Sequence, residues 1–291
     1  MRLAVCHPEE AARERIASRL RGATVELCAD LSQLRTREKG DAVMLAGVAE
    51  WSAVEGLLTA GAHVLLVANP CPPSSVIDTL FASAQKIWVQ LIVVNPERYL
   101  PSRQLIRQQL LSGPLGEAGL LRVHRWEPPA PNIAPTATGL PDALLRDLDV
   151  VLWLTALEPD RVFAVEHKSD ATGRYIQVHL GFPHGGMALV DYTNQLPAGD
   201  GYQSLSVIAA SGAAYADDHQ NTQLLYRGVH PHGIRTEETA AALAAIAQEF
   251  VDALRDMREL STSMVNAWRE VFVVAEAVQK SLASGRVVEW R

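Results

Sequence analysis

The stretch HVLLVANP, residues 63–70, decides the fold of the first part of the chain. Its apolar, partly β-branched run ends at Asn69 and Pro70, which is typical of a strand buried on both faces that leads into a polar turn. Similar runs occur on either side, separated by helical stretches at 9–21, 49–60 and 74–85: RLAVC, TVELCAD, DAVMLAG and IWVQLIVVN. Strands that alternate with amphipathic helices predict a parallel sheet covered on both faces, so we expect a Rossmann-like α/β domain.

After about residue 160 the apolar period changes to two. Runs with this period are divided by Gly, Pro, Asn and Asp turns: RVFAVEH, GRYIQVHLGF, GMALVDYT, SLSVIAA, AAYADDH and TQLLYRG. They predict an α+β domain with an open, mainly antiparallel sheet. We expect two closing helices, one capped by Thr236 and one that begins at Ser261 or Thr262 and ends at Gly285. The expected domains are 1–100 and 101–291.

Composition narrows the classes of partner. The net charge is -7 and the arginines are scattered, so the sequence predicts no nucleic-acid partner. The start of the chain is not typical of a signal peptide, and the run VVLWLTAL is far shorter than the roughly 20 apolar residues that cross a membrane. Cys6, Cys28 and Cys71 form no CxxC pair, so we expect no disulfide and a cytoplasmic protein.

Three segments carry a family resemblance. They are NPERYLPSRQLIRQQLLSGPLGEAGLLRVHRWEP at 95–128, DALLRDLDVVLWL at 142–154 and ASGAAYADD at 210–218. With them the chain resembles the glucose-fructose oxidoreductase, inositol dehydrogenase and rhizopine catabolism family, shortened to Gfo/Idh/MocA. The resemblance implies an NAD(P) cofactor in the first domain and oxidation or reduction of sugars, inositols or related polyols in a cleft between the domains.

The turn after the first strand departs from that family. A Gly-rich turn normally lets backbone amides approach the dinucleotide pyrophosphate, whereas this chain reads VCHPEEAARER. Glu9 and Glu10 suit the first turn of a helix, but their charge repels an anion at the same position. Asp30 ends the second strand, where a ribose-binding carboxylate is expected, although it could equally cap the helix that begins at Leu31. NAD(P) binding, which the resemblance implies, is therefore in question.

Asn69 occupies the position of the family's catalytic lysine, which the resemblance places in a Glu-Lys-Pro turn. An amide can hydrogen-bond a hydroxyl, but it neither carries charge nor exchanges a proton near neutral pH. Pro70 is retained, so we expect the turn itself to persist.

The third departure lies in the family's Asp-x-x-x-His-x-x-Asp helix. Counting back from Trp153 places its two aspartates at Asp142 and Asp149 and its histidine at Arg146. Arginine stays protonated and cannot serve as a general base, but it can hold a carboxylate or phosphate through two hydrogen bonds. A surface ion pair between Asp142 and Arg146 remains an alternative.

Other candidates for ligand contact are Arg98 and Tyr99, at family positions near the domain junction, and His179 on a strand whose polar face holds Tyr175 and Gln177. A structural role for Arg98 and Tyr99 is equally open. The pairs His167/His179, His184/Asp191 and His230/His232 lack the spacing of a metal site, so no metal is predicted.

These departures favour a degenerate oxidoreductase that binds a sugar, a polyol or an anionic small molecule, or serves as a partner subunit, without hydride transfer. One alternative is an NAD(P)-dependent polyol dehydrogenase whose proton acceptor is Tyr99, His124 or His179. Another is a purely structural partner of an active homologue. In each case we expect a homo-oligomer or hetero-oligomer formed through the second-domain sheet.

Overall fold

The computed structural model describes residues 1–34, 40–47, 50–129, 138–168, 173–196, 201–217, 222–227, 230–234 and 238–289. The chain divides into two compact units. Unit 1 comprises Met1–Leu100 and Glu237–Arg269, and unit 2 comprises Pro101–Thr236 and Glu270–Arg291. The segment 237–269, which we expected in the second domain, is instead part of unit 1.

Unit 1 contains a parallel sheet with strand order β2-β1-β3-β4-β5. Its strands are β1 (Arg2–Cys6), β2 (Thr24–Cys28), β3 (Ala42–Ala46), β4 (His63–Val67) and β5 (Leu91–Val94). The helices α1 (Glu10–Arg19), α2 (Trp51–Thr59) and α3 (Ser74–Ile87) alternate with them, and short 3-10 turns lie at Leu31–Gln33 (η1) and Pro96–Tyr99 (η2). The Rossmann-like expectation is confirmed.

The fifth strand is shorter than the apolar run IWVQLIVVN predicts. Helix α3 continues to Ile87, and Trp88 then ends it in the left-handed conformation with φ of 61°. The strand begins only at Leu91. An apolar run by itself does not separate the last turn of a helix from the strand that follows, which explains the difference.

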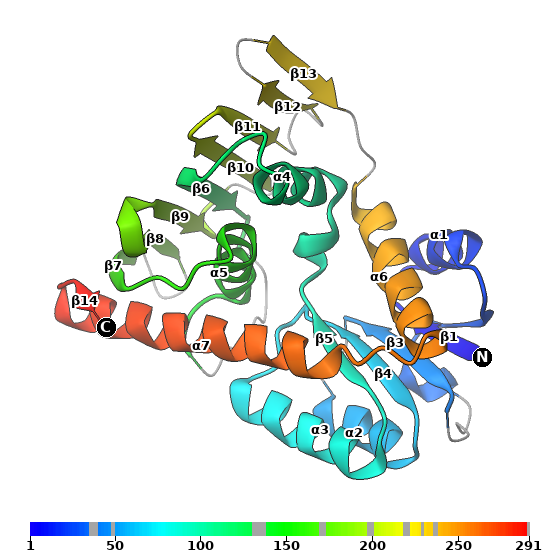
Figure 1. Ribbon diagram of the computed structural model, residues 1–291. Helices are drawn as coiled ribbons and strands as arrows, with labels where there is room; N and C mark the ends of the chain where they lie inside the picture. The colour runs from blue at the N-terminus through cyan, green and yellow to red at the C-terminus, as the bar shows by residue number, and fades with distance from the viewer. Residues whose placement is uncertain are drawn as a thin grey trace. The chain divides into compact units, whose positions relative to one another are not determined.

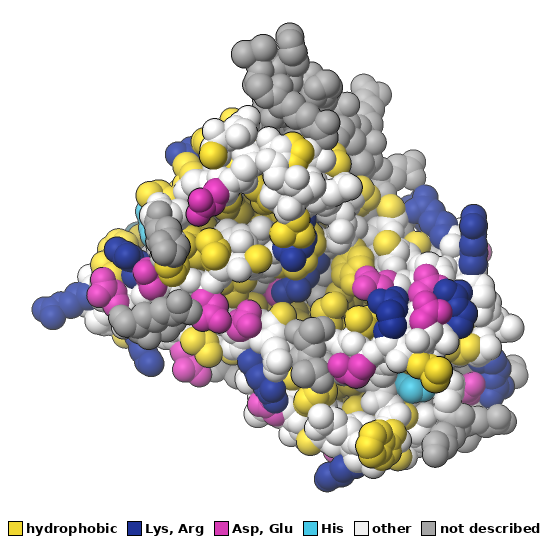
Figure 2. All heavy atoms as spheres, in the orientation of Figure 1, with side chains coloured by type: hydrophobic (Ala, Val, Ile, Leu, Met, Phe, Trp, Pro, Cys, Tyr) yellow, Lys and Arg dark blue, Asp and Glu magenta, His cyan; other side chains and the backbone are white. Residues whose placement is uncertain are grey.

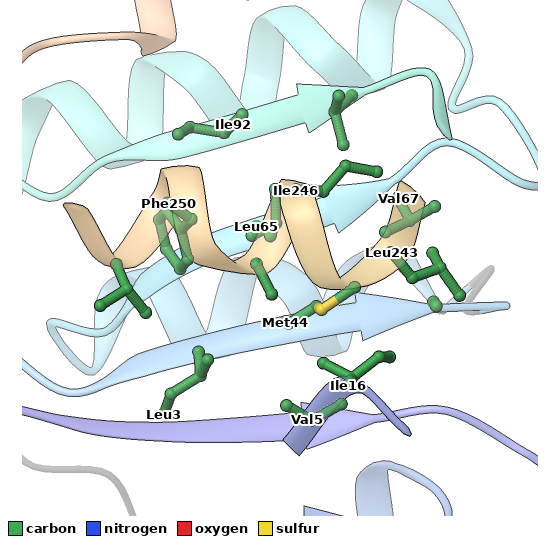
Figure 3. Packing of buried hydrophobic residues seen from close by; sticks show 14 of the residues in the cluster. Leu3, Val5, Ile16, Met44, Leu65, Val67, Ile92, Leu243, Ile246 and Phe250 are labelled. Atoms are coloured by element: carbon green, nitrogen blue, oxygen red, sulfur yellow. The ribbon is translucent and has the colours of Figure 1, made fainter. Parts of the chain in front are cut away.

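Helix α6 (Glu238–Arg255) completes the core of unit 1 (Figures 1 and 3). Its Leu243, Ile246 and Phe250 pack against side chains of the sheet such as Met44 and Leu65. Helix α1 contributes Ile16 to the same cluster, whereas α2 and α3 lie along the other face of the sheet (Figure 1). Segment 237–269 therefore belongs to unit 1 because its apolar face covers part of the sheet that α1 leaves open.

Unit 2 is built on a second sheet with the order β13-β12-β11-β10-β6-β9-β8-β7-β14. Its strands are β6 (Ala118–Trp126), β7 (Arg161–Lys168), β8 (Arg174–Gly181), β9 (Met187–Thr193), β10 (Tyr202–Ala209), β11 (Gly212–Asp217), β12 (Thr222–Arg227), β13 (His230–Ile234) and β14 (Val288–Glu289). Strands β6 and β9 pair in parallel, whereas the other described pairs are antiparallel. The expected open, mainly antiparallel sheet is confirmed.

Helices cover one face of this sheet. Helix α5 (Asp142–Thr155) packs against β6 and β9 and is buried over most of its length, and α4 (Pro101–Leu111) contacts α5. Helix α7 (Ser261–Ser284) also reaches this face, where Ser281 Oγ accepts a 2.9 Å hydrogen bond from the backbone N–H of Ala164. Gly285, at φ of 65°, follows its last residue, as expected for a helix stop.

Gly116 in the Gly-x-Leu-Gly segment is required by packing. Its φ is 74°, and a Cβ at this position would lie 3.2 Å from Ala210 Cβ and 3.3 Å from Ser211 Oγ. A larger side chain would therefore face both a backbone penalty and a close contact. The expected caps at Thr236, Ser261 and Thr262 fall on side chains outside the described residues, as do residues 130–137 of the Pro-rich loop and the side chains of His184, His230 and His232.

Candidate functional site

A cavity of about 350 Å³ lies at the carboxyl ends of β1, β2 and β3 in unit 1. Strand β1 lies between β2, which follows it in the sequence, and β3, which comes after β2. The strand order of the sheet therefore reverses beside β1, at the position of the cavity. Ligands of open α/β sheets bind at such switch points. The lining residues are Cys6, Pro8, Ala29, Asp30, Leu31, Ser32, Ala46, Gly47 and Glu50.

The turn between β1 and α1 satisfies its own polar groups. The imidazole Nδ1 of His7 accepts a 3.0 Å hydrogen bond from the backbone N–H of Glu9, the residue at the N-cap of α1. Arg13 Nη1 donates to the carbonyls of His7 at 2.6 Å and of Pro8 at 3.1 Å. Burial lowers the pKa of His7, which keeps its ring in the neutral form that accepts this bond.

Two features of this turn oppose the binding of a dinucleotide pyrophosphate. Backbone amides at the start of a helix bind phosphate because they are otherwise without acceptors, whereas here one of them, the Glu9 N–H, already donates to His7. Glu10 adds a carboxylate in the first turn of α1, and Glu50 places another on the wall of the cavity. The Glu10 charge opposes an anion at the start of α1, and the Glu50 charge, at the N-cap of α2, opposes one in the cavity.

Asp30 caps a 3-10 turn and also lines the switch-point cavity. Its carboxylate accepts hydrogen bonds from the backbone N–H of Ser32 at 2.9 Å and from the Ser32 hydroxyl at 2.5 Å, so it caps the turn η1. The Ser32 hydroxyl holds the pKa of Asp30 below its usual range. Asp30 also lines the switch-point cavity, where an ionised carboxylate can accept from ligand hydroxyl groups.

Asn69 and Arg98 follow the neighbouring strands β4 and β5, at the same edge of the sheet as the cavity. Asn69 is exposed, and the peptide bond between Asn69 and Pro70 is cis. Arg98 is half-buried in η2. Neither is among the residues that line the cavity, and neither side chain can exchange a proton near neutral pH.

Tyr99 is held within unit 1. Its hydroxyl donates a 2.6 Å hydrogen bond to Glu249 Oε2 on α6, and its ring packs against the core of that unit. Burial, followed by the Glu249 charge, raises the pKa of Tyr99 far above its usual value. Deprotonation near neutral pH is therefore strongly disfavoured, which argues against Tyr99 as a general base.

In unit 2, Asp142 and Arg146 pair directly in the first turns of α5. Arg146 Nη1 donates to Asp142 Oδ2 at 2.9 Å, with exposed side-chain fractions of 10% and 13%. The pair is therefore largely buried, unlike the surface ion pair that the sequence left as an alternative. Asp149, on the same helix, is buried as well.

The structure separates His179 from Arg146. Strand β8 alternates as predicted: Ile176, Val178 and Leu180 are buried, whereas Tyr175, Gln177 and His179 are exposed. Helix α5 packs on the buried face, so His179 lies on the opposite, open face of the sheet.

His124 also lies on this open face. Its Nδ1 is 3.1 Å from Asp191 Oδ2, and the same oxygen accepts a 3.1 Å hydrogen bond from Trp126 Nε1. The Trp126 ring lies 5.1 Å from that of Tyr202, measured between centroids. The sheet thus carries a polar and aromatic cluster on the side away from α5.

The described part of the chain shows neither a metal-binding cluster nor a membrane-spanning helix. No group of three or more His, Cys, Asp or Glu side chains there is arranged to hold a metal ion. Among those residues, no helix has both the length and the apolar composition that a bilayer crossing requires. Lys and Arg side chains are interspersed with Asp and Glu over the face shown in Figure 2.

Solved structures with the same architecture include proteins described as dehydrogenases and oxidoreductases. A probable dehydrogenase from Thermotoga maritima superimposes with a TM-score of 0.78 and 17% identity, over 99% of this chain and 98% of that one. An oxidoreductase from Agrobacterium radiobacter, in complex with NAD+, L-tartaric acid and magnesium, gives a TM-score of 0.74 and 15% identity over 99% and 98% of the two chains. The chain has the fold of these solved dehydrogenases, which include a myo-inositol dehydrogenase from Corynebacterium glutamicum. The fold that the family resemblance implies is therefore confirmed.

A sequence comparison agrees with the Gfo/Idh/MocA fold. Myo-inositol dehydrogenase Hyg17 from Streptomyces leeuwenhoekii is 32% identical over 168 residues, which are 55% of this chain and 50% of that protein. The match thus spans half the length of the relative. No family model matches the chain.

Sequence reasoning missed the roles of His7 and Glu249. The position of His7, two residues before the N-cap of a helix, could have indicated its role, because a ring at that position can reach the N–H of the cap residue. Glu249 carries no such signal, since its partner Tyr99 is 150 positions away in the chain.

Proposed function

We propose that this protein uses a Gfo/Idh/MocA dehydrogenase fold to bind a small molecule or a partner subunit and does not transfer hydride to or from NAD(P). The observation that carries the proposal is the turn after β1, where His7 occupies the N–H of Glu9 and no glycine admits a phosphate. Asn69 and Arg146, at the family's lysine and histidine positions, support it because neither can act as a general acid or base.

Calorimetric titration with NAD+, NADH, NADP+ and NADPH tests this proposal. We expect no binding heat up to millimolar dinucleotide. A micromolar dissociation constant for any of the four would remove the observation that carries the proposal, because it would mean that the turn accepts a pyrophosphate; turnover with NAD(P) would overturn the proposal itself.

A matched pair of variants tests the physical reason. Glu9→Gln combined with Glu10→Gln removes two charges at the helix end and is expected to give binding heat at millimolar dinucleotide that the wild type lacks. Glu14→Gln removes a charge beyond the first turn of α1 and should leave the titration without binding heat, since the dipole effect falls off within one turn. Equal effects of the two variants would exclude the helix-end repulsion.

We make two further, separate proposals: Asn69 and Arg98, in unit 1, contact a sugar or polyol, and Arg146, in unit 2, contacts a small anionic ligand. Two probes distinguish these classes in a thermal-shift measurement: myo-inositol as a polyol and L-tartrate as a dicarboxylate. If Arg146 holds a carboxylate, Arg146→Lys abolishes the L-tartrate shift because it removes the two-pronged donor, whereas Arg269→Lys on α7 retains it. Absence of a shift with both probes would contradict these contacts.

A second candidate function is that of an NAD(P)-dependent polyol dehydrogenase. The switch-point cavity with Asp30 on its wall and the similarity to a myo-inositol dehydrogenase favour it. Turnover of myo-inositol with NAD(P) is the deciding assay. If turnover is found, its loss in Tyr99→Phe, His124→Ala or His179→Ala would identify the proton acceptor, and activity in all three would exclude these residues.

We also propose that a second copy of this chain covers the open face of the unit 2 sheet. Six large apolar side chains at least 37% exposed lie on this face: Trp126, Val165, Tyr175, Met187, Ile208 and Tyr215. A flat face of this kind is self-complementary about a two-fold axis. Sedimentation should show a dimer that Ile208→Glu dissociates and Trp88→Glu, an exposed change in unit 1, does not. A monomeric wild type would overturn the homo-oligomer and direct the search to a different partner chain.

A further inference from the structure

Cys6 and Cys28 are direct neighbours in the unit 1 sheet, although 21 residues separate them in the chain. They are register partners at the carboxyl ends of the parallel strands β1 and β2. Side chains of directly paired residues point to the same face of a sheet, and neighbouring strands lie about 4.8 Å apart. This separation falls within the range of about 4.4–6.8 Å between the Cα atoms of disulfide-bonded cysteines.

The environment of the two thiols combines burial with access to a small reagent. Both residues are 1% exposed and both are thiols in this structure. Cys6 nevertheless forms part of the wall of the switch-point cavity. The Cys28 Sγ lies 3.9 Å from both Glu26 Oε1 and the Gln33 carbonyl oxygen.

Strand β2 is at the edge of the sheet and pairs only with β1 among the described strands. An edge strand can move toward its single neighbour without disturbing a second ladder. The ladder continues past the cysteines through a 3.2 Å hydrogen bond from the His7 N–H to the Cys28 carbonyl. Both features favour closure of a bond between the two sulfur atoms with a small displacement.

We propose that Cys6 and Cys28 form a reversible dithiol–disulfide pair that responds to peroxides. The Cys6 thiolate attacks a peroxide oxygen, the O–O bond breaks, and the products are a Cys6 sulfenic acid and water or an alcohol. The Cys28 thiolate then attacks the Cys6 sulfur, an S–S bond forms, and the leaving hydroxide takes up a proton as water. In sum, two thiols and one hydrogen peroxide give one disulfide and two waters.

The bond would act on the cavity next to it. Cys28 is followed directly by Ala29, Asp30, Leu31 and Ser32, all of which line the cavity. Fastening the end of β2 to β1 fixes the start of this segment. The redox state of the pair thereby influences the wall that a ligand of the switch-point cavity would contact.

The test is thiol counting and peptide mapping on the full-length protein treated with one equivalent of hydrogen peroxide. We expect three alkylatable thiols before treatment and one after it, a mass lower by about 2 Da, and recovery of all three on addition of dithiothreitol. Mapping without reductant should join the peptide that contains Cys6 to the peptide that contains Cys28 and leave Cys71 as a thiol.

Two variants sharpen the result. Cys71→Ser should still lose two thiols, whereas Cys28→Ser should form no intramolecular bond and should leave a Cys6 sulfenic acid that dimedone traps. Retention of all three thiols, oxidation of Cys71 in preference, or a bond between two different chains would each overturn the proposal. Mapping of the wild-type protein decides the question even if a variant fails to fold.

Discussion

The guanidinium of Arg125 on β6 and the carboxylate of Asp147 on α5 form two hydrogen bonds, of 2.7 and 2.6 Å, in the interior of unit 2. Asp147 is fully buried and Arg125 is 6% exposed. Each charge depends on the other, because neither can be hydrated where it lies. This pair fastens α5, with Asp142 and Arg146 near its start, to the centre of the sheet.

Asp147→Asn is therefore expected to lower the free energy of unfolding by about 3–5 kcal/mol, since it leaves a buried guanidinium without its counter-charge. Urea denaturation measures the change. Arg125→Met combined with Asp147→Leu should lose less than the single variant. Asp160→Asn, in an ion pair whose arginine side chain is 56% exposed, should leave the midpoint unchanged. A single variant as stable as wild type would contradict the argument.

Tyr99→Phe removes the hydroxyl that bonds to Glu249 but keeps the ring that packs on the core. We expect a loss of about 1–3 kcal/mol in the stability of unit 1, because the acceptor is a charged carboxylate. Tyr175→Phe, which alters an exposed hydroxyl on β8, is the control and should have no effect. If the two variants behave alike in denaturation, the bond from Tyr99 does not hold η2 to α6.

Phe250→Ala tests whether α6 belongs to the core of unit 1. Phe250 is 1% exposed, so its truncation should cost about 3–5 kcal/mol. Hydrogen exchange localises the effect: amides of β3 and β4 should lose protection, whereas those of β8 and β9 should not. Val273→Ala, at a side chain 54% exposed on α7, provides the comparison. Loss of protection confined to β8 and β9 would be inconsistent with this assignment.

Stability should fall as the pH drops below about 6.5. Burial lowers the pKa of both His7 and His63 from the usual value of 6.5. Below that pH the unfolded chain binds protons at these residues while the folded chain does not, so protonation favours unfolding until the folded pKa is reached. Their contribution is complete above pH 6.5 and is lost as the pH falls through this window.

Urea midpoints at pH 7.5, 6.5 and 5.5 measure this dependence. His63 Nδ1 accepts a 3.0 Å hydrogen bond from the Gln90 N–H, and an asparagine oxygen can take the same place without titrating. His63→Asn should therefore reduce the slope between pH 6.5 and 5.5. An unchanged slope would mean that His63 does not contribute to it.

Local sequence patterns predicted most of the strands, but they did not predict which strands lie side by side. The apolar runs predicted β1, β3 and β4 because strands buried on both faces are continuously apolar, and the period of two predicted which side of β8 is buried. A period does not specify a pairing partner. Strand β6 accordingly lies between β9 and β10 and separates two strands that are consecutive in the sequence.

For the candidate site too, the sequence predicted some features and the tertiary structure determined others. The identities of Asn69, Arg146 and the glutamates after β1 follow from the sequence, and with them the absence of a titratable group near neutral pH at those positions. Contacts between distant segments determine the other features. Tyr99 bonds to Glu249, and His179 and Arg146 lie on opposite sides of one sheet.

The sequence by itself determined the two classes of sheet, the helix stop at Gly285 and the chemical character of each candidate residue, because periodicity, backbone freedom and side-chain chemistry are local properties. Only the tertiary structure decided that α6 covers the first sheet, that His7 occupies the cap of α1 and that Cys6 lies beside Cys28. These outcomes depend on which surfaces come together to exclude water, and that choice is made by the folded chain as a whole.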